Sequence, residues 1–200
     1  GIKRLTYHPG RDTAVGWSPD GKSVLFSSSR ANAPRSWERL FTVDIEGGTP
    51  QALPMNRAFN GAYSEDGETL VYRRAGYWDK GWRNYRGGQN QALRMIDLKS
   101  LEEQDLPFNN DFDIDPVYSG DYIYFLSNRS QVSNVFRYNT QSKNVEQVTN
   151  STSFDVMSFD LDGDTLVYEY MGDFYSQKGM APAQKLSINI ASDFYWLREQ

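Results

Sequence analysis

A turn motif that recurs four times constrains the fold of this chain more than any other feature. Each copy places Asp-Gly, or Gly-Asp, between two runs rich in β-branched and aromatic residues, which is typical of a tight β-hairpin. The first copy occupies residues 17–26, and the others begin at Tyr63, Tyr118 and Phe159. A repeat of roughly 40 to 55 residues indicates an array of similar units.

The runs that follow these turns are apolar at consecutive positions. They are Val24-Leu25-Phe26, Leu70-Val71-Tyr72, Ile123-Tyr124-Phe125 and Leu166-Val167-Tyr168. Because side chains alternate between the two faces of a strand, both faces must be covered. Third strands are expected near 40–44, 93–97, 135–139 and 174–177, and short fourth strands near 51–53, 104–106, 147–149 and 185–187. This pattern, without helical periodicity, predicts an all-β fold: a β-propeller of four-stranded antiparallel blades.

The repeat also suggests where the blades begin and end. We expect blades at residues 7–53, 54–106, 107–149 and 150–190, with an exit segment at 191–200. Residues 1–6 are similar to the fourth strand of a blade near 146–149, so we interpret them as the last strand of a preceding blade. The second blade carries a long insert at 73–91 between two of its strands.

Composition narrows the possible functions. The 21 Lys and Arg residues against 26 Asp and Glu give a net charge of -5, which argues against a nucleic-acid partner. With no cysteine and a single histidine, His8, few groups remain for nucleophilic, acid–base or metal chemistry. We therefore expect no catalytic residue, no metal and no cofactor, and place a stand-alone hydrolase or lyase third among the functions considered. No apolar run approaches the roughly 20 residues of a membrane helix, so we expect no membrane association, while the compartment stays open.

The insert concentrates basic and aromatic residues in an otherwise acidic chain. The candidate peptide-binding residues are Arg73, Arg74, Trp82, Arg83, Tyr85 and Arg86. Guanidinium groups can pair with peptide carboxylates and carbonyls while the rings pack apolar side chains. The alternative interpretation is a loop that folds over the blade rim, with its arginine stems lying on its own aromatic rings.

Two acidic motifs and the lone histidine receive structural interpretations. Asp160, Asp162 and Asp164 occupy the turn position of the repeat, which predicts a plain turn rather than a calcium loop. The alternating acidic residues between 111 and 115 are interpreted as a solvated entrance to a blade rather than a metal site. His8 precedes Pro-Gly, and we expect it to make structural hydrogen bonds in a turn.

Several motifs resemble one known family. These are the Ser-Pro-Asp-Gly-Lys turn and the runs at 5–10, 82–88, 125–129 and 166–170, with the tail at 185–193. Together they resemble the closing blades of the N-terminal six-bladed propeller of tricorn and tricorn-like serine peptidases, and more generally the repeats of TolB-type propellers. Asn84 departs from the family pattern, which commonly has a basic residue there. The resemblance implies that the four blades are part of a six-bladed propeller and that the catalytic residues belong to domains further downstream.

The resemblance implies a function and a set of partners. We expect a non-catalytic domain of a tricorn-like peptidase that admits or docks peptides, with a peptide or protein ligand and downstream peptidase domains as partners. The alternative is a TolB-like propeller that binds a protein and has no protease attached. Four blades of a six-bladed ring leave an opening, so we also expect exposed apolar faces on the blades at 7–53 and 150–190 and self-association through them.

Overall fold

The chain folds into β-sheets alone. The computed structural model describes residues 1–31, 37–76 and 85–189, and within these ranges it contains strands β1 to β16 and no helix. The described residues thus include no helix that could cross a membrane. The prediction of an all-β fold is confirmed.

The strands form four separate sheets of four. The first two consist of β1 (Asp12–Trp17), β2 (Ser23–Ser28), β3 (Arg39–Asp44) and β4 (Gln51–Ala52), and of β5 (Asn60–Tyr63), β6 (Thr69–Arg73), β7 (Arg94–Asp97) and β8 (Glu103–Asp105). The last two consist of β9 (Ile114–Ser119), β10 (Tyr122–Ser130), β11 (Val132–Asn139) and β12 (Val145–Gln147), and of β13 (Val156–Asp162), β14 (Thr165–Tyr170), β15 (Asp173–Lys178) and β16 (Gln184–Lys185). Within each sheet, consecutive strands pair antiparallel, so each sheet is a meander.

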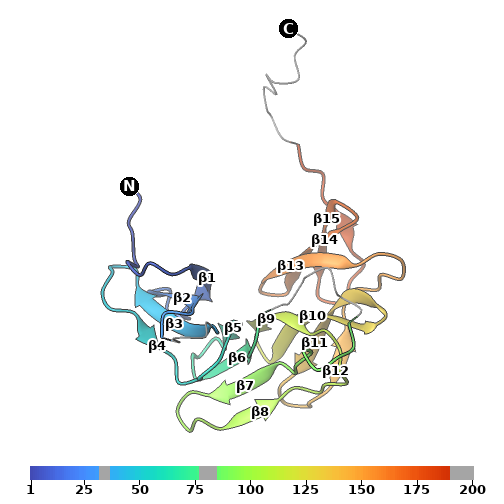
Figure 1. The fold of residues 1–200 in the computed structure, drawn as a ribbon. Coiled ribbons are helices and arrows are strands. Elements are labelled where there is room, and N and C mark those ends of the chain that lie inside the picture. Colours follow the sequence, from blue (N-terminus) through green and yellow to red (C-terminus); the bar gives the residue numbers. More distant parts are fainter. Residues whose placement is uncertain (32–36, 77–84, 190–200) are drawn as a thin grey trace.

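The four sheets stand as blades around an open arc. Figure 1 shows the first strands β1, β5, β9 and β13 facing the centre and the fourth strands β4, β8 and β12 on the outside. The arc leaves a gap between the blade β1–β4 and the blade β13–β16. This arrangement confirms the predicted β-propeller architecture with four-stranded blades.

Side-chain hydrogen bonds explain why the turn motif recurs. In the first copy, Ser18 Oγ donates to Asp20 Oδ1 at 2.6 Å and accepts from the Ser23 amide at 2.9 Å. The second copy repeats both bonds, with Ser64, Asp66 and Thr69 at 2.6 and 2.9 Å. The glycine of each turn has a positive φ, 68° in the first copy and 74° in the second, which favours glycine. Hydrogen bonding to Ser18 also lowers the pKa of Asp20.

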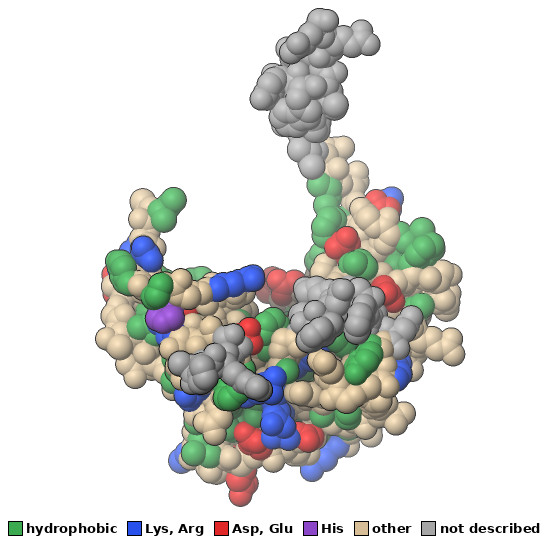
Figure 2. Space-filling model, in the orientation of Figure 1, with side chains coloured by type: hydrophobic (Ala, Val, Ile, Leu, Met, Phe, Trp, Pro, Cys, Tyr) green, Lys and Arg blue, Asp and Glu red, His purple; other side chains and the backbone are tan. Residues whose placement is uncertain are grey.

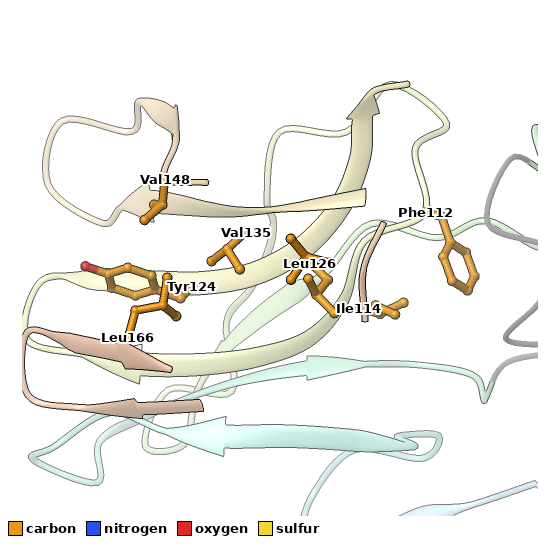
Figure 3. Close-up of a cluster of buried hydrophobic side chains, with 8 residues drawn as sticks. Phe112, Ile114, Tyr124, Leu126, Val135, Val148 and Leu166 are labelled. Carbon is orange, nitrogen blue, oxygen red and sulfur yellow. The ribbon is translucent and has the colours of Figure 1, made fainter. Parts of the chain in front are cut away.

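Apolar side chains pack between each pair of neighbouring blades. One cluster joins the first and second blades around Leu25, Leu40 and Leu70, and another joins the second and third around Val71 and Phe125. A third cluster joins the last two blades, and Figure 3 shows its side chains between the sheets. The cores of this fold therefore lie at the junctions between blades.

The two end blades differ in how their outer faces are covered. On the first blade, Phe26, Phe41 and Val43 are 3–4% exposed, and both Leu5 of the N-terminal segment and the guanidinium group of Arg30 lie against this cluster. The expectation of an exposed apolar face on this blade is wrong for these three residues. On the last blade, Val167 of β14 is only half-buried and Phe174 of β15 is 42% exposed, so the exposed apolar face expected on this blade is present among the described residues.

The two ends of the chain contribute no strand to the four described sheets. Residues 1–8 belong to no strand, so the interpretation of residues 1–6 as the last strand of a preceding blade stays a prediction. The expected exit segment at 191–200 lies outside the described residues.

Replacing Leu70 by alanine tests the importance of the junction between the first and second blades. Leu70 is fully buried there, so the Leu70→Ala variant should lose about 2–5 kcal/mol of unfolding free energy through the cavity it leaves. Met180→Ala is the control, because Met180 is 55% exposed and its replacement should change stability by less than about 0.5 kcal/mol. Urea denaturation followed by tryptophan fluorescence measures both, and equal midpoints for the two variants would contradict the assignment of the core to the junctions.

Candidate functional site

A cleft of about 440 Å³ lies where the innermost strands of all four blades converge. Its lining comes from Arg11, Thr13, Ala14, Val15 and Ser27 of the first blade, Phe59, Asn60 and Gly61 of the second, Asp115, Pro116 and Val117 of the third, and Phe159 of the fourth. Figure 2 shows basic side chains of the N-terminal blade reaching toward acidic ones in the opening between the first and last blades. The cleft combines groups of both charges with aromatic rings.

Glycine at position 61 lets β5 pack closely on β6 at the wall of this cleft. A Cβ atom built on Gly61 would lie 2.4 Å from the backbone oxygen of Val71, which is shorter than any tolerated contact. Any other residue would push β5 away from β6 and distort the strand that carries Asn60. The position therefore requires glycine for a close approach of two backbones.

Asn60 and Asp115 form a polar pair in the wall of the cleft. Asn60 Nδ2 donates a hydrogen bond of 3.0 Å to Asp115 Oδ1, which joins the second blade to the third. Asp115 has a φ of 51°, in the left-handed region, immediately before Pro116. Asn60 Oδ1 is shielded from solvent and, among the described residues, receives no hydrogen bond. A ligand could reach this oxygen only if the Asn60 side chain turned toward the cleft.

Arg11 and two phenylalanines complete the chemistry of the cleft. Arg11 is exposed and precedes β1, so its guanidinium group can donate to an incoming carbonyl or carboxylate. Phe59 and Phe159 contribute rings from the second and fourth blades. The lining thus offers a hydrogen-bond donor, an acceptor and apolar surface to one ligand.

The residues of the insert take different environments. Arg73 ends β6 and is 2% exposed, and its guanidinium carbon lies 5.1 Å from the centre of the Phe112 ring. Arg74, the next residue, is exposed. Trp82 and Arg83 lie outside the described residues. Peptide binding by Arg73 and its neighbours in the insert stays a prediction.

The end of the insert is anchored to the third blade. The side chain of Asn90 donates hydrogen bonds to the backbone oxygens of Tyr85, at 2.7 Å, and of Asn110, at 2.8 Å. Arg86 donates to the backbone oxygen of Asn128 at 3.2 Å and lies 3.6 Å from Asp111 Oδ1. These bonds hold Tyr85 and Arg86 near the start of the third blade.

An arginine and an aspartate clamp the inner end of the third blade. Arg129 donates to both carboxylate oxygens of Asp113, at 2.9 and 3.1 Å. Its guanidinium carbon lies 5.1 Å from the ring centre of Phe125 and 5.2 Å from that of Phe136. Asp113 is 2% exposed, and burial raises its pKa. Asp111 is also buried, so the interpretation of this stretch as a solvated entrance is wrong.

The first blade repeats the same clamp. Arg30 pairs with Asp12 and lies 5.0 Å from the ring centre of Phe26 and 5.4 Å from that of Phe41. Burial acts to raise the pKa of Asp12, but hydrogen bonds, above all from Arg30, lower it overall. The two clamps share a sequence pattern, a Ser-x-Arg run at the end of the second strand and an aspartate at, or directly before, the start of the first strand. Sequence reasoning missed this pair because its two members are well separated along the chain.

The acidic turn near residue 163 and His8 both have the structural roles that the sequence predicted. Gly163 and Asp164 form the turn between β13 and β14, as the sequence predicted, with Asp162 opposite Thr165. His8 Nδ1 accepts a hydrogen bond of 3.0 Å from the Gly10 amide, which is the expected structural role. Within the described part of the chain, no three His, Cys, Asp or Glu side chains gather as a metal ion would require.

Four meander blades around a mixed polar and aromatic cleft define this chain as a β-propeller. The family model for the tricorn protease N-terminal beta propeller domain matches residues 1–181. The chain therefore belongs to this family. The prediction of a tricorn-like propeller is confirmed.

Individual relatives agree with this assignment. The tricorn protease homolog of Saccharolobus solfataricus is 24% identical over 195 residues, and the putative tricorn protease homolog 2 of Streptomyces coelicolor is 27% identical over 203 residues. These alignments cover 96% and 94% of this chain but only 18% and 17% of the relatives, so the chain spans less than a fifth of their length.

Solved structures share the fold. The crystal structure of the tricorn protease has a TM-score of 0.79 at 20% identity, covering 96% of this chain and 19% of that one. TolB from Acinetobacter baumannii has a TM-score of 0.66 at 19% identity, covering 89% and 44%. Each contains a region with the same fold as the described blades of this chain.

The clamp of the third blade can be tested by removing its arginine. Arg129→Met should lower the unfolding free energy by about 3–5 kcal/mol, because Asp113 would remain buried without its counter-charge. The double variant Asp113→Leu/Arg129→Met should be more stable than Arg129→Met, since it removes the unpaired charge. Lys178→Met is the control, because Lys178 and Asp164 form an exposed pair worth less than about 1 kcal/mol. If Arg129→Met and Asp113→Leu/Arg129→Met had the same denaturation midpoint, this result would argue against a buried ion pair.

Proposed function

We propose that this propeller admits or docks peptides for a tricorn-like serine peptidase and itself contributes no catalytic residue. The observation that carries the proposal is the cleft at the centre of the arc, whose volume of about 440 Å³ is in the usual range for ligand sites. Membership in the tricorn N-terminal propeller family supports a peptidase context.

The lining of the cleft suits an extended peptide. A peptide main chain presents both N–H donors and carbonyl acceptors, and it needs a partner of each kind. Arg11 would donate to a carbonyl or to a terminal carboxylate, and Asn60 Oδ1 would accept from a peptide N–H once its side chain turns toward the cleft. Phe59 and Phe159 would pack against apolar side chains of the bound peptide. Such packing would not require one particular peptide sequence.

The insert would extend this site at the rim. A Cβ atom on Gly76 would lie 3.0 Å from the ring of Phe59, so the insert leaves the second blade directly beside the cleft wall. Arg86, at the far end of the insert, is partly exposed beside the third blade. Arg74, Trp82, Arg83 and Tyr85 are the further residues proposed to steer peptides carrying negative charge toward the cleft.

A TolB-like protein-binding role is the second candidate. The observation in its favour is the structural likeness to TolB, with a TM-score of 0.66. The family match over residues 1–181 and the higher TM-score of 0.79 to the tricorn protease favour the first candidate.

The purified chain should hydrolyse no peptide. Its single histidine is engaged in a turn, which leaves no described His-paired nucleophile. The measurement is turnover of fluorogenic peptides and casein by the wild-type chain and by His8→Ala. Hydrolysis that disappears in His8→Ala would overturn the non-catalytic assignment.

Peptide binding should depend on the arginines of the insert and of the cleft. Calorimetric titration with acidic hexapeptides should show a loss of about 1.5–3 kcal/mol for each charge-assisted bond removed in Arg83→Ala/Arg86→Ala or in Arg11→Ala. Arg57→Ala is the matched control, since Arg57 is exposed and does not line the cleft. Amidating the peptide C-terminus should weaken binding to the wild type more than to these variants. Unchanged affinity in all variants, or no binding by the wild type, would count against the peptide site.

A further inference from the structure

A second pocket, of about 250 Å³, lies at the junction between the third and fourth blades. One wall is formed by residues 149–152, which follow β12, and the other by Tyr168 and Tyr170 of β14 and Tyr175 of β15. Val156 of β13, which is fully buried, also lines it. We name this site the tyrosine pocket. It shares no lining residue with the central cleft, and both of its walls belong to described blades.

The three tyrosines form one aromatic surface. Tyr168 and Tyr175 lie opposite each other on β14 and β15, with ring centres 5.5 Å apart and ring planes 16° apart. Tyr170 meets Tyr175 edge-on, with ring centres 6.0 Å apart and planes at 65°. All three side chains are half-buried. The rings therefore make a surface with a corner, against which a compact apolar ring can pack.

The hydroxyl groups of these tyrosines are available to a ligand. Among the described residues, none of the three has a hydrogen-bond partner, whereas the Tyr72 hydroxyl donates to Glu103 Oε1 at 2.7 Å. Burial raises the pKa of Tyr168, and the nearby hydroxyl groups of Tyr175 and Tyr170 raise it further. Tyr168 therefore stays protonated at neutral pH and can donate a hydrogen bond. Partly buried tyrosines usually use this donor, which points to a missing acceptor.

Hydrogen bonds hold both walls of the tyrosine pocket in place. The fully buried side chain of Asn134 donates to the Ser151 oxygen at 3.0 Å and accepts from the Ser151 amide at 2.8 Å and from Thr149 Oγ1 at 2.9 Å. Across the junction, Gln177 Nε2 of the fourth blade donates to the Val148 oxygen at 3.2 Å. The pocket is thus preformed, so a ligand pays little to order it.

The tyrosine pocket favours an uncharged ligand. Within the described chain, its lining contains no charged side chain. Lys185 and Asp173 lie opposite Tyr175 and Tyr170 in the strand register, but they pair with each other at 2.6 Å. A cation would find no free carboxylate here, and an anion would find no free cation. The remaining chemistry is aromatic packing combined with hydrogen-bond donation.

A proline-rich peptide has the complementary chemistry. Proline has no backbone N–H, so such a peptide presents carbonyl acceptors and few donors. The tyrosine hydroxyls and the exposed side-chain amide of Asn150, which also lines the pocket, supply donors. Proline-rich segments already adopt the extended polyproline II helix, and they bind grooves lined by aromatic rings. An oligosaccharide would present many hydroxyl donors, for which the lining offers no carboxylate.

We propose that the tyrosine pocket binds a proline-rich segment of a partner protein in the polyproline II conformation. Proline rings would pack on Tyr170 and Tyr175, and backbone carbonyls of the segment would accept hydrogen bonds from the tyrosine hydroxyls. This role goes beyond the admission of peptides at the central cleft, and it does not depend on that cleft.

Binding of a labelled decaproline peptide to the full chain, followed by fluorescence anisotropy, tests the site. The wild type should bind, and Tyr170→Ala should weaken binding by roughly tenfold or more because it removes an aromatic anchor. Tyr175→Phe keeps the ring and removes only a hydroxyl, so it should weaken binding by about two- to tenfold. Tyr7→Ala is the matched control, since Tyr7 is 76% exposed and does not line the pocket. No binding by the wild type, or equal weakening by Tyr7→Ala, would overturn the proposal.

Two further variants separate the tyrosine pocket from the rest of the molecule. Thr152→Arg places a long charged side chain at the exposed rim without touching the core, so it should block the decaproline peptide while the fold is kept. Arg11→Ala should leave this binding unchanged, because Arg11 lines the central cleft. Loss of binding in Arg11→Ala but not in Thr152→Arg would place the peptide in the cleft and refute the proposal.

A comparison of ligands tests the chemical class. A decapeptide of alternating glycine and serine should not bind, and equal affinity for it and for decaproline would contradict the proposal. Binding of maltohexaose that Tyr170→Ala abolishes, without binding of decaproline, would mean a sugar site and would likewise refute it. Acidic peptides that fail to bind would count against the central cleft alone, so the two proposals can fail separately.

Discussion

Burial of apolar side chains between successive blades is the interaction on which the rest of this structure depends. A four-stranded sheet on its own has two faces to cover, and each inner blade covers both with its neighbours. The second-strand residues Leu25, Val71 and Tyr124 lie at the three junctions and are 0–6% exposed. Because the blades stack through these contacts, their innermost strands converge and enclose the central cleft.

The repeat made most of this fold predictable from the sequence. The Asp-Gly turns predicted hairpins because only a residue that tolerates positive φ closes them, and Gly21 and Gly67 have that conformation. The consecutive apolar positions predicted burial on both faces, which holds in β6 and fails at Val167 because burial depends on a neighbouring blade. Both sequence patterns depend on neighbouring residues alone, so they can be recognised without knowledge of the tertiary structure.

The candidate site was much less predictable, because its parts come from different blades. Asn60 and Asp115 meet across a blade junction, and no spacing in the sequence indicates that pairing. Asp113 seemed solvated from its acidic neighbours, but Arg129 on an adjacent strand neutralises it inside the blade. The family resemblance supplied the peptidase context, while the cleft supplies the chemistry that the proposed peptide docking requires.

Hydrogen exchange of the native chain, resolved by strand, tests the dependence on junctions most directly. At a concentration at which the chain is monomeric, the amides of β6 and β10 should exchange slowest, because both faces of these strands are covered. Those of β14 should exchange markedly faster, since one face of this strand is open. Equal protection of β14 and β10 in the monomer would contradict the account, because it would mean that each blade is stable without its neighbours.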